Sequence, residues 1–122
     1  MSNSNVLVVE DDRYSGEVVA IMLKHNQISV DVAPTAEKAL QMLRLKSFGL
    51  VLIDLALPGM NGLELLQAIK NDPRLENMLC AAMTAFHDSK VAQEAAEAGF
   101  DVYFPKPLQS SFMKDVKRLL AG

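Results

Sequence analysis

The stretch VLIDLALPGMNG, residues 51–62, sets an apolar run directly before a single carboxylate, Asp54, and follows it with a turn-forming Pro58-Gly59 pair. Together with Leu50, the run is continuously apolar, which is typical of a parallel strand covered on both faces of its sheet. Such a strand aims its terminal carboxylate at the edge of the sheet. The chemistry of the carboxylate therefore depends on which other residues lie at that edge.

Short apolar runs alternate with longer amphipathic segments five times along the chain. The run at 6–9 is continuously apolar like that at 50–53, whereas the run at 28–33 alternates apolar and polar residues, as a half-exposed edge strand does. Five alternations of strand and helix predict an α/β fold with a parallel sheet and right-handed crossovers. The predicted strands are 6–9, 28–33, 50–53, 78–83 and 102–104.

The segments between these runs have helical spacing. Apolar residues recur at i, i+3, i+4 and i+7 within Ala36–Leu43, with Thr35 as the expected N-cap, and the same spacing returns in Phe112–Leu120. A weaker repeat in Val91–Ala98 stops at Gly99, a typical helix terminator. The remaining two helices are predicted from about Tyr14 to His25 and from Leu63 to Lys70.

Length and composition indicate a single globular domain, residues 1–122, with half of the residues hydrophobic and 22% charged. A net charge of −3 argues against direct nucleic-acid binding, which needs clustered basic residues. The single cysteine, Cys80, excludes an internal disulfide and a CxxC motif, and its apolar neighbours predict a buried, inert thiol. No signal-like or membrane-spanning segment stands out, so a cytoplasmic location without membrane contact is expected. The sequence ends with its fifth helix, so we expect no output domain within it.

Chemically active side chains follow four of the predicted strands. The acidic triplet 10–12 follows the first strand, Asp54 the third, Thr84 the fourth and Lys106 the fifth. In a doubly wound sheet these carboxyl ends share one edge, where ligands bind. Clustered carboxylates suit a divalent cation such as Mg²⁺ or Mn²⁺, while a lysine and a hydroxyl can hold phosphoryl oxygens. Taken alone, the acidic triplet could equally be favourable charge at a helix N-terminus.

Four motifs carry a resemblance to a known family. They are VLVVEDD at 6–12, VLIDLALPGMNG at 51–62, MTA at 83–85 and YFPKP at 103–107. From Val6 to about Leu120 the chain resembles a receiver (CheY-like) domain of a two-component response regulator. The resemblance implies a flavodoxin-like (βα)5 fold, a doubly wound parallel sheet of five strands in the order 2-1-3-4-5.

The resemblance also implies roles for individual residues. Asp54 is the expected phosphoacceptor, Lys106 and Thr84 are expected to contact the phosphoryl group, and Tyr103 is the expected aromatic switch. The expected ligands of Mg²⁺ (or Mn²⁺) are Glu10, Asp11, Asp54 and the backbone carbonyl of Ala56. Asp12, one position further on, is not counted as a primary ligand.

The implied partners are those of a phosphorelay. A sensor histidine kinase or a histidine phosphotransfer protein would donate the phosphoryl group, and a downstream output protein or domain would read the result. Inward movement of Thr84 on phosphorylation would vacate space for the ring of Tyr103 and alter the surface of the fourth helix, fifth strand and fifth helix. A weak homodimer through that surface is also expected.

Some positions depart from the family's commoner pattern. Ala56 and Phe86 are apolar where relatives often carry polar side chains near the phosphoryl group, so we expect slow loss of the phosphate. Asn61 replaces a frequent Asp and can still cap the following helix. Because Lys106 must turn back from its strand towards Asp54, we predict a cis peptide bond between Lys106 and Pro107.

Three alternatives remain open. A cofactor binder or small hydrolase on the same fold is disfavoured by the acidic EDDRYSG loop at 10–16, which would repel a phosphate. A metal-dependent phosphatase typically has a second catalytic carboxylate at the position where this chain has Ala56. A degenerate receiver that binds partners without phosphorylation would not need the full set of acidic, hydroxyl and lysine residues.

Overall fold

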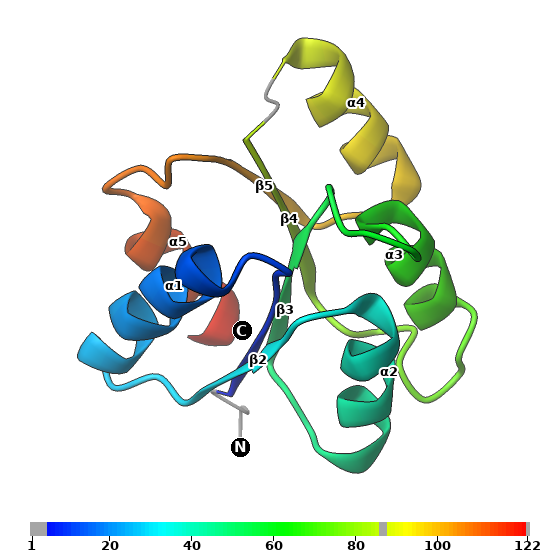
Figure 1. The fold of residues 1–122 in the computed structure, drawn as a ribbon, viewed down its shortest axis with the longest axis horizontal. Coiled ribbons are helices and arrows are strands. Elements are labelled where there is room, and N and C mark those ends of the chain that lie inside the picture. Colours follow the sequence, from blue (N-terminus) through cyan, green and yellow to red (C-terminus); the bar gives the residue numbers. More distant parts are fainter. Residues whose placement is uncertain (1–4, 86–87, 122) are drawn as a thin grey trace.

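The computed structural model describes residues 5–85 and 88–121 and shows a parallel sheet of five strands with helices on both faces (Figure 1). The strand order is β2-β1-β3-β4-β5, as predicted. The strands are β1 (Val6–Val9), β2 (Val30–Ala33), β3 (Leu50–Asp54), β4 (Cys80–Thr84) and β5 (Val102–Pro105). The helices are α1 (Arg13–His25), α2 (Ala36–Leu45), α3 (Gly62–Lys70), α4 (Ser89–Ala98) and α5 (Phe112–Ala121).

Two cores lie on opposite faces of the sheet. The helices α1 and α5 cover one face, and α2, α3 and α4 cover the other (Figure 1). Both cores are needed because β1, β3 and β4 are buried on either side, which explains their continuously apolar sequences. Under α5, Phe104 meets Phe112 edge to face with ring centroids 4.9 Å apart.

The edge strand β2 is partly exposed, in agreement with its alternating sequence. It begins at Val30 and not at Ile28 as predicted, because the Ile28 N–H donates to the Leu23 carbonyl and closes the end of α1. Similarly, β4 begins at Cys80 and not at Met78, whose N–H donates to the Leu75 carbonyl. Local turn bonds therefore shorten both predicted strands at their first residues.

Side chains at the helix starts direct the loops around the carboxyl edge of the sheet. Asp12 caps α1, and Thr35 caps α2 as predicted. Asn61 forms a capping box with Glu64 at the start of α3, which confirms its expected capping role. At the far end of α4, Gly99 ends the helix with φ of 114°, a conformation that favours glycine.

Two further features of the chain agree with its sequence. Cys80 is buried, and burial raises the pKa of its thiol to about 12, so the thiol stays protonated and unreactive. None of the helices within residues 5–85 and 88–121 is long and apolar enough to cross a bilayer.

Candidate functional site

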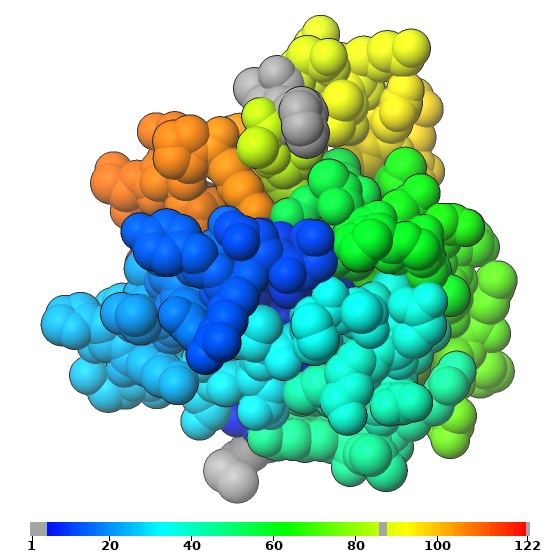
Figure 2. Space-filling model, in the orientation of Figure 1, coloured from blue at the N-terminus to red at the C-terminus, as the bar shows by residue number. Residues whose placement is uncertain are grey.

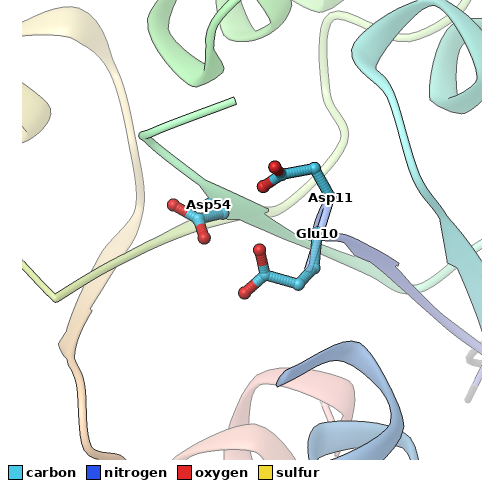
Figure 3. A group of neighbouring side chains, drawn as sticks. All are labelled: Glu10, Asp11 and Asp54. Carbon is cyan, nitrogen blue, oxygen red and sulfur yellow. The ribbon is translucent and has the colours of Figure 1, made fainter. Parts of the chain in front are cut away.

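Three carboxylates converge at the carboxyl edge of the sheet. Glu10 and Asp11 follow β1, and Asp54 ends the neighbouring strand β3, whose Ile53 lies in register with Val9. Their side chains face a common space (Figure 3), with one oxygen of each within 4.8 Å of the others. Asp11 is exposed, whereas Glu10 is 2% and Asp54 6% exposed. The predicted acidic cluster is therefore present in this structure.

The alternation of side chains along the strands explains which groups meet. Residues two apart on a strand point to the same face of a sheet. Val8, Leu52 and Phe104 pack in the core under α1 and α5. Two residues after each of them come, in the same order, Glu10, Asp54 and Lys106. The three polar groups thus emerge on the side of the sheet that α1 and α5 cover.

Lys106 reaches across this space to two of the acids. Its Nζ donates to Asp54 Oδ2 at 2.9 Å and also to Glu10 Oε1. Its own position is set by its backbone N–H, which donates to the Thr84 carbonyl at 2.8 Å. The Lys106–Pro107 peptide bond is cis, which confirms the prediction made from the sequence. Lys106 is predicted from the sequence to turn towards Asp54 and to contact the phosphoryl group; the additional contact of Lys106 with Glu10 is a finding of the structure.

The backbone around Asp54 is held by a hydrogen bond from Ala56 and by close packing against Gly62. The Ala56 N–H donates to Asp54 Oδ1 at 2.8 Å, whereas Lys106 donates to the other carboxylate oxygen. A Cβ on Gly62 would lie 2.6 Å from the Asp54 carbonyl oxygen and 2.8 Å from Leu55 Cα, so only glycine fits there. Gly62 is a positioning residue that sequence reasoning missed, although it closes the motif that drew attention to Asp54.

Burial and charge set the protonation of the site. Burial, reinforced by the hydrogen bond with Asp54, raises the pKa of Glu10 to about 7. Burial also opposes ionisation of Asp54, but hydrogen bonds with Glu10, the Ala56 N–H and Lys106 outweigh it and lower the pKa of Asp54. Burial alone would lower the pKa of Lys106, yet the facing carboxylates raise it. Asp54 is therefore a carboxylate and Lys106 an ammonium at neutral pH.

Two residues singled out from the sequence lie on the other face. Thr84 ends β4 and is buried, and Tyr103 in β5 is half-buried against the core under α3 and α4. In register, Tyr103 pairs with Ala82 and Pro105 with Thr84, so Thr84 and Tyr103 point to the same face. Phe86, which was expected to influence the lifetime of the phosphate, lies outside the described residues.

The charges of the arrangement suit a divalent cation. When ionised, three carboxylates against one ammonium leave an excess of two negative charges, which a divalent cation would balance. Asp12 does not join the cluster: its side chain accepts from the N–H and hydroxyl of Ser15 as the cap of α1. Its exclusion from the primary ligands is thus consistent with the geometry.

Comparison with known proteins identifies one family and several relatives of this chain. Residues 6–117 match the family model described as response regulator receiver domain. The uncharacterized 14.6 kDa protein in the sodA1 3′ region of Leptolyngbya boryana is 32% identical over 108 residues, which are 88% of this chain and 82% of that protein. The aerobic respiration control sensor protein ArcB of Escherichia coli K12 is 39% identical over 105 residues, which are 85% of this chain but 13% of ArcB.

A solved structure agrees in fold and in sequence. The response regulator protein TrrA of Thermotoga maritima, in complex with Mg(2+)-BeF, is 25% identical and superposes with a TM-score of 0.85. The superposition covers 96% of this chain and 99% of that chain. The similarity therefore extends over nearly the whole chain.

Proposed function

Because this chain belongs to the response regulator receiver domain family, the signalling modules of two-component systems, we propose that it accepts a phosphoryl group on Asp54. A phosphohistidine of a sensor histidine kinase or of a histidine phosphotransfer protein is the proposed donor. The observation that carries the proposal is the environment of Asp54, whose ionised carboxylate lies at the end of β3, 2.9 Å from the Lys106 ammonium and beside two further acids. The direct test is a mass increase of one phosphoryl group on incubation with acetyl phosphate and Mg²⁺.

Each residue of the site has a separate role in the proposed transfer. A carboxylate oxygen of Asp54 attacks phosphorus, and the bond to the donor nitrogen breaks. Lys106 Nζ, already within hydrogen-bond distance of Asp54, balances the charge of the incoming phosphoryl oxygens. The Thr84 hydroxyl then hydrogen-bonds the product. Phosphoryl transfer depends on such positioning and charge balance more than on covalent help from the protein.

Mg²⁺, or Mn²⁺ in its place, is the proposed cofactor. Glu10, Asp11, Asp54 and the backbone carbonyl of Ala56 would hold it, since hard cations prefer oxygen ligands and the three carboxylates lie within 4.8 Å of one another. Bound there, the cation supplies positive charge that reduces repulsion between the acids and the phosphoryl dianion. The likeness to TrrA, solved with Mg(2+)-BeF, supports this assignment.

We expect Asp11→Asn to weaken Mg²⁺ binding by about tenfold or more, because the substitution removes one of few charged ligands. Calorimetric or NMR titration with Mg²⁺ measures the effect. The matched control is Asp12→Asn, which makes the same charge change one position away and keeps a good N-cap on α1. Equal Mg²⁺ affinity in the wild type and Asp11→Asn would rule out the proposed ligand set.

The output of the module is proposed to be a change of the surface formed by α4, β5 and α5. Thr84 and Tyr103 share one face of the sheet, so movement of the hydroxyl towards a phosphoryl group would free space for the ring. A downstream output protein or domain would read this surface, and a weak homodimer would form through it. Direct binding of nucleic acid is not part of the proposal.

The phosphorylated state is proposed to be long-lived. Hydrolysis needs a water held beside phosphorus, and the exposed methyl group of Ala56 cannot orient one. Next to Ala56 and Thr84 lies a cavity of about 220 Å³ whose walls include Leu55, Leu63 and Val91. Its lining is mostly apolar, with Thr84 and Glu94 as the polar members, and so offers few groups that could orient a water.

We therefore expect Ala56→Asn combined with Phe86→Glu to accelerate loss of the phosphoryl group by a factor of about 10 to 100. Decay of the phosphorylated form after removal of the donor, in Mg²⁺, is the measurement. Ala56→Val serves as a control that changes the size but not the polarity of the side chain. Decay in the double variant that is no faster than in the wild type would show that these two positions do not set the lifetime.

A further inference from the structure

A pocket lies at the amino ends of the strands, at the opposite edge of the sheet from the acidic cluster. It has a volume of about 270 Å³ and is formed by residues 43–48, which end α2 and precede β3, and by Arg74, Leu75 and Met78, which precede β4. In Figure 2 the teal surface of the first segment borders the light green surface of the second along the lower edge of the molecule. The length of β3, about 13 Å, separates this edge from Asp54. These residues together are called the basic pocket below.

The charged side chains that line the basic pocket, among the residues that the structure describes, are all cations. They are Arg44, Lys46 and Arg74. Their acidic partners, Asp31 and Asp72, stand outside the lining. Three cations against two acids leave an excess of one positive charge here, although the whole chain carries a net charge of −3. The basic pocket therefore attracts negatively charged groups.

One carboxylate holds both arginines of the pocket in place. Asp72 accepts from Nε and from a terminal nitrogen of Arg74, at 3.3 Å each, and lies 3.6 Å from Nε of Arg44. Hydrogen bonds from the backbone N–H and the guanidinium of Arg74 lower the pKa of Asp72, so this carboxylate stays ionised at neutral pH. The pairing uses one edge of the Arg74 guanidinium, whose side chain is 72% exposed. Its other edge and its flat faces are therefore presented to an occupant in an ordered position, which reduces the entropic cost of binding.

Apolar side chains complete the pocket. Phe48 and Leu75 are 5% and 6% exposed and form its floor, whereas Leu45, at its rim, is 87% exposed. The Lys46 ammonium lies 5.6 Å from the centroid of the Phe48 ring, which keeps this cation close to the floor. One exposed leucine is ordinary on a protein surface. Beside ordered arginines and an apolar floor, however, it matches the composition of protein interfaces, in which arginine and aromatic residues are enriched.

The end of α2 indicates which kind of anion fits. The last carbonyls of a helix carry partial negative charge, and residues 43–45 of the lining belong to the last turn of α2. A free phosphate would concentrate two negative charges beside these carbonyls. The separate carboxylates of a peptide can instead approach Arg44 and Arg74 one at a time, while apolar side chains between them cover Leu45. Charge and apolar surface together thus favour a peptide over an inorganic anion.

We infer that the basic pocket receives a segment of a partner protein in which acidic and apolar side chains alternate, with its carboxylates on Arg44 and Arg74 and its apolar side chains on Leu45 and the pocket floor. The inference goes beyond the proposed phosphoryl transfer. An occupant of the basic pocket lies at the opposite edge of the sheet and leaves Asp54 accessible. The chain can therefore be attached to such a partner in both its unphosphorylated and its phosphorylated form.

Fluorescence anisotropy with a synthetic peptide tests the inference. The probe is a short labelled peptide in which aspartate and glutamate alternate with leucine and phenylalanine. One control peptide replaces the acids by asparagine and glutamine, and another replaces the apolar residues by serine. We expect the parent peptide to bind about tenfold more tightly than either control, and its affinity to fall as the salt concentration rises.

Variants of exposed residues assign the binding to the basic pocket. Arg74→Ala should weaken binding of the parent peptide by about tenfold. Arg118→Ala is the matched control, because Arg118 is 70% exposed and pairs with a nearby aspartate, but lies on α5 at the other face of the sheet. Leu45→Ser should also weaken binding by about tenfold, whereas Ile21→Ser, at a position on α1 that is 65% exposed, should not.

Amide chemical-shift changes on addition of the peptide should map to residues 43–48 and 74–78. No binding of the parent peptide, equal affinities of the parent and control peptides, or equal losses in Arg118→Ala and Arg74→Ala would overturn the inference. Displacement of the peptide by inorganic phosphate, beyond the effect of sodium chloride at equal ionic strength, would show a small-anion site instead. Self-association of the wild type that Leu45→Ser abolishes would show that the occupant is a second copy of the chain.

The variant Asp54→Asn separates this inference from the proposed function. It should bind the parent peptide with the affinity of the wild type, because the basic pocket lies at the other edge of the sheet. Loss of peptide binding in Asp54→Asn would place the peptide at the acidic cluster and overturn the inference. A wild type that binds the peptide but gains no phosphoryl group from acetyl phosphate would contradict the proposed function alone.

Discussion

The variant Asp54→Asn is expected to incorporate no phosphoryl group from acetyl phosphate in the presence of Mg²⁺, whereas the wild type gains one. The asparagine amide keeps the size of the side chain and can still accept the Ala56 N–H, which donates at 2.8 Å in this structure. It lacks the anionic oxygen that attacks phosphorus. The variant should therefore fold and fail only in the chemical step, and intact-mass spectrometry over the course of the reaction measures the difference.

A neighbouring acid supplies the control for this result. Asp12→Asn makes the same chemical change outside the acidic cluster, at the cap of α1, and should be phosphorylated like the wild type. If Asp54→Asn gains a phosphoryl group to the same extent as the wild type, the assignment of the acceptor is wrong.

Replacing Lys106 by methionine should slow phosphorylation by acetyl phosphate about a hundredfold, which corresponds to roughly 2.7 kcal/mol of transition-state stabilisation. The Nζ of Lys106 lies 2.9 Å from Asp54 Oδ2 and also contacts Glu10, so the substitution removes the ammonium that pairs with both buried acids. Methionine retains most of the length of the side chain. The initial rate of phosphorylation at saturating Mg²⁺ is the quantity to compare.

The expected effect depends on position and not merely on net charge. Lys114→Met, on the exposed side of α5, removes one positive charge far from the acids and should leave the rate unchanged. A thermal unfolding curve for Lys106→Met checks that the variant is folded at the assay temperature. A rate within a factor of about two of the wild type, in a folded Lys106→Met, would show that the ammonium does not act in the transfer.

The sheet could be predicted because the residues of each strand indicate whether that strand is buried or lies at the edge of the sheet. The continuous apolar runs of β1 and β3 and the alternation in β2 correspond directly to buried and edge positions. The first residues of β2 and β4 could not be predicted in the same way. Ile28 and Met78 are apolar like the strands they precede, but hydrogen bonds to nearby helix or turn carbonyls hold their backbones outside the ladders.

The residues of the candidate site could be predicted because they stand at strand ends. The contacts between them could not be predicted in this way. That Glu10 and Asp54 meet is a consequence of β1 and β3 being neighbours in register. The contact of Lys106 with Glu10 and the raised pKa of that acid depend on burial and distance, which no residue pattern states. Gly62 likewise reveals its role only when the Asp54 carbonyl is seen beside it.

Which apolar residues of α1 are buried and which are exposed could not be predicted from the sequence either. The helix carries more apolar residues than one buried face can hold, and the sequence does not say which of them are left over. Only the packing shows that Val19 and Leu23 enter the core while Tyr14 and Ile21 remain exposed.

Identification of the phosphorylated residue tests the central proposal most directly. Borohydride reduction converts an aspartyl phosphate into homoserine, and peptide sequencing by mass spectrometry then locates the modified position. After treatment with acetyl phosphate and Mg²⁺, the wild type is predicted to carry homoserine at position 54 and at no other aspartate. Homoserine at position 11 or 12, or an unmodified residue 54 in phosphorylated protein, would contradict the assignment of Asp54 as the phosphoacceptor.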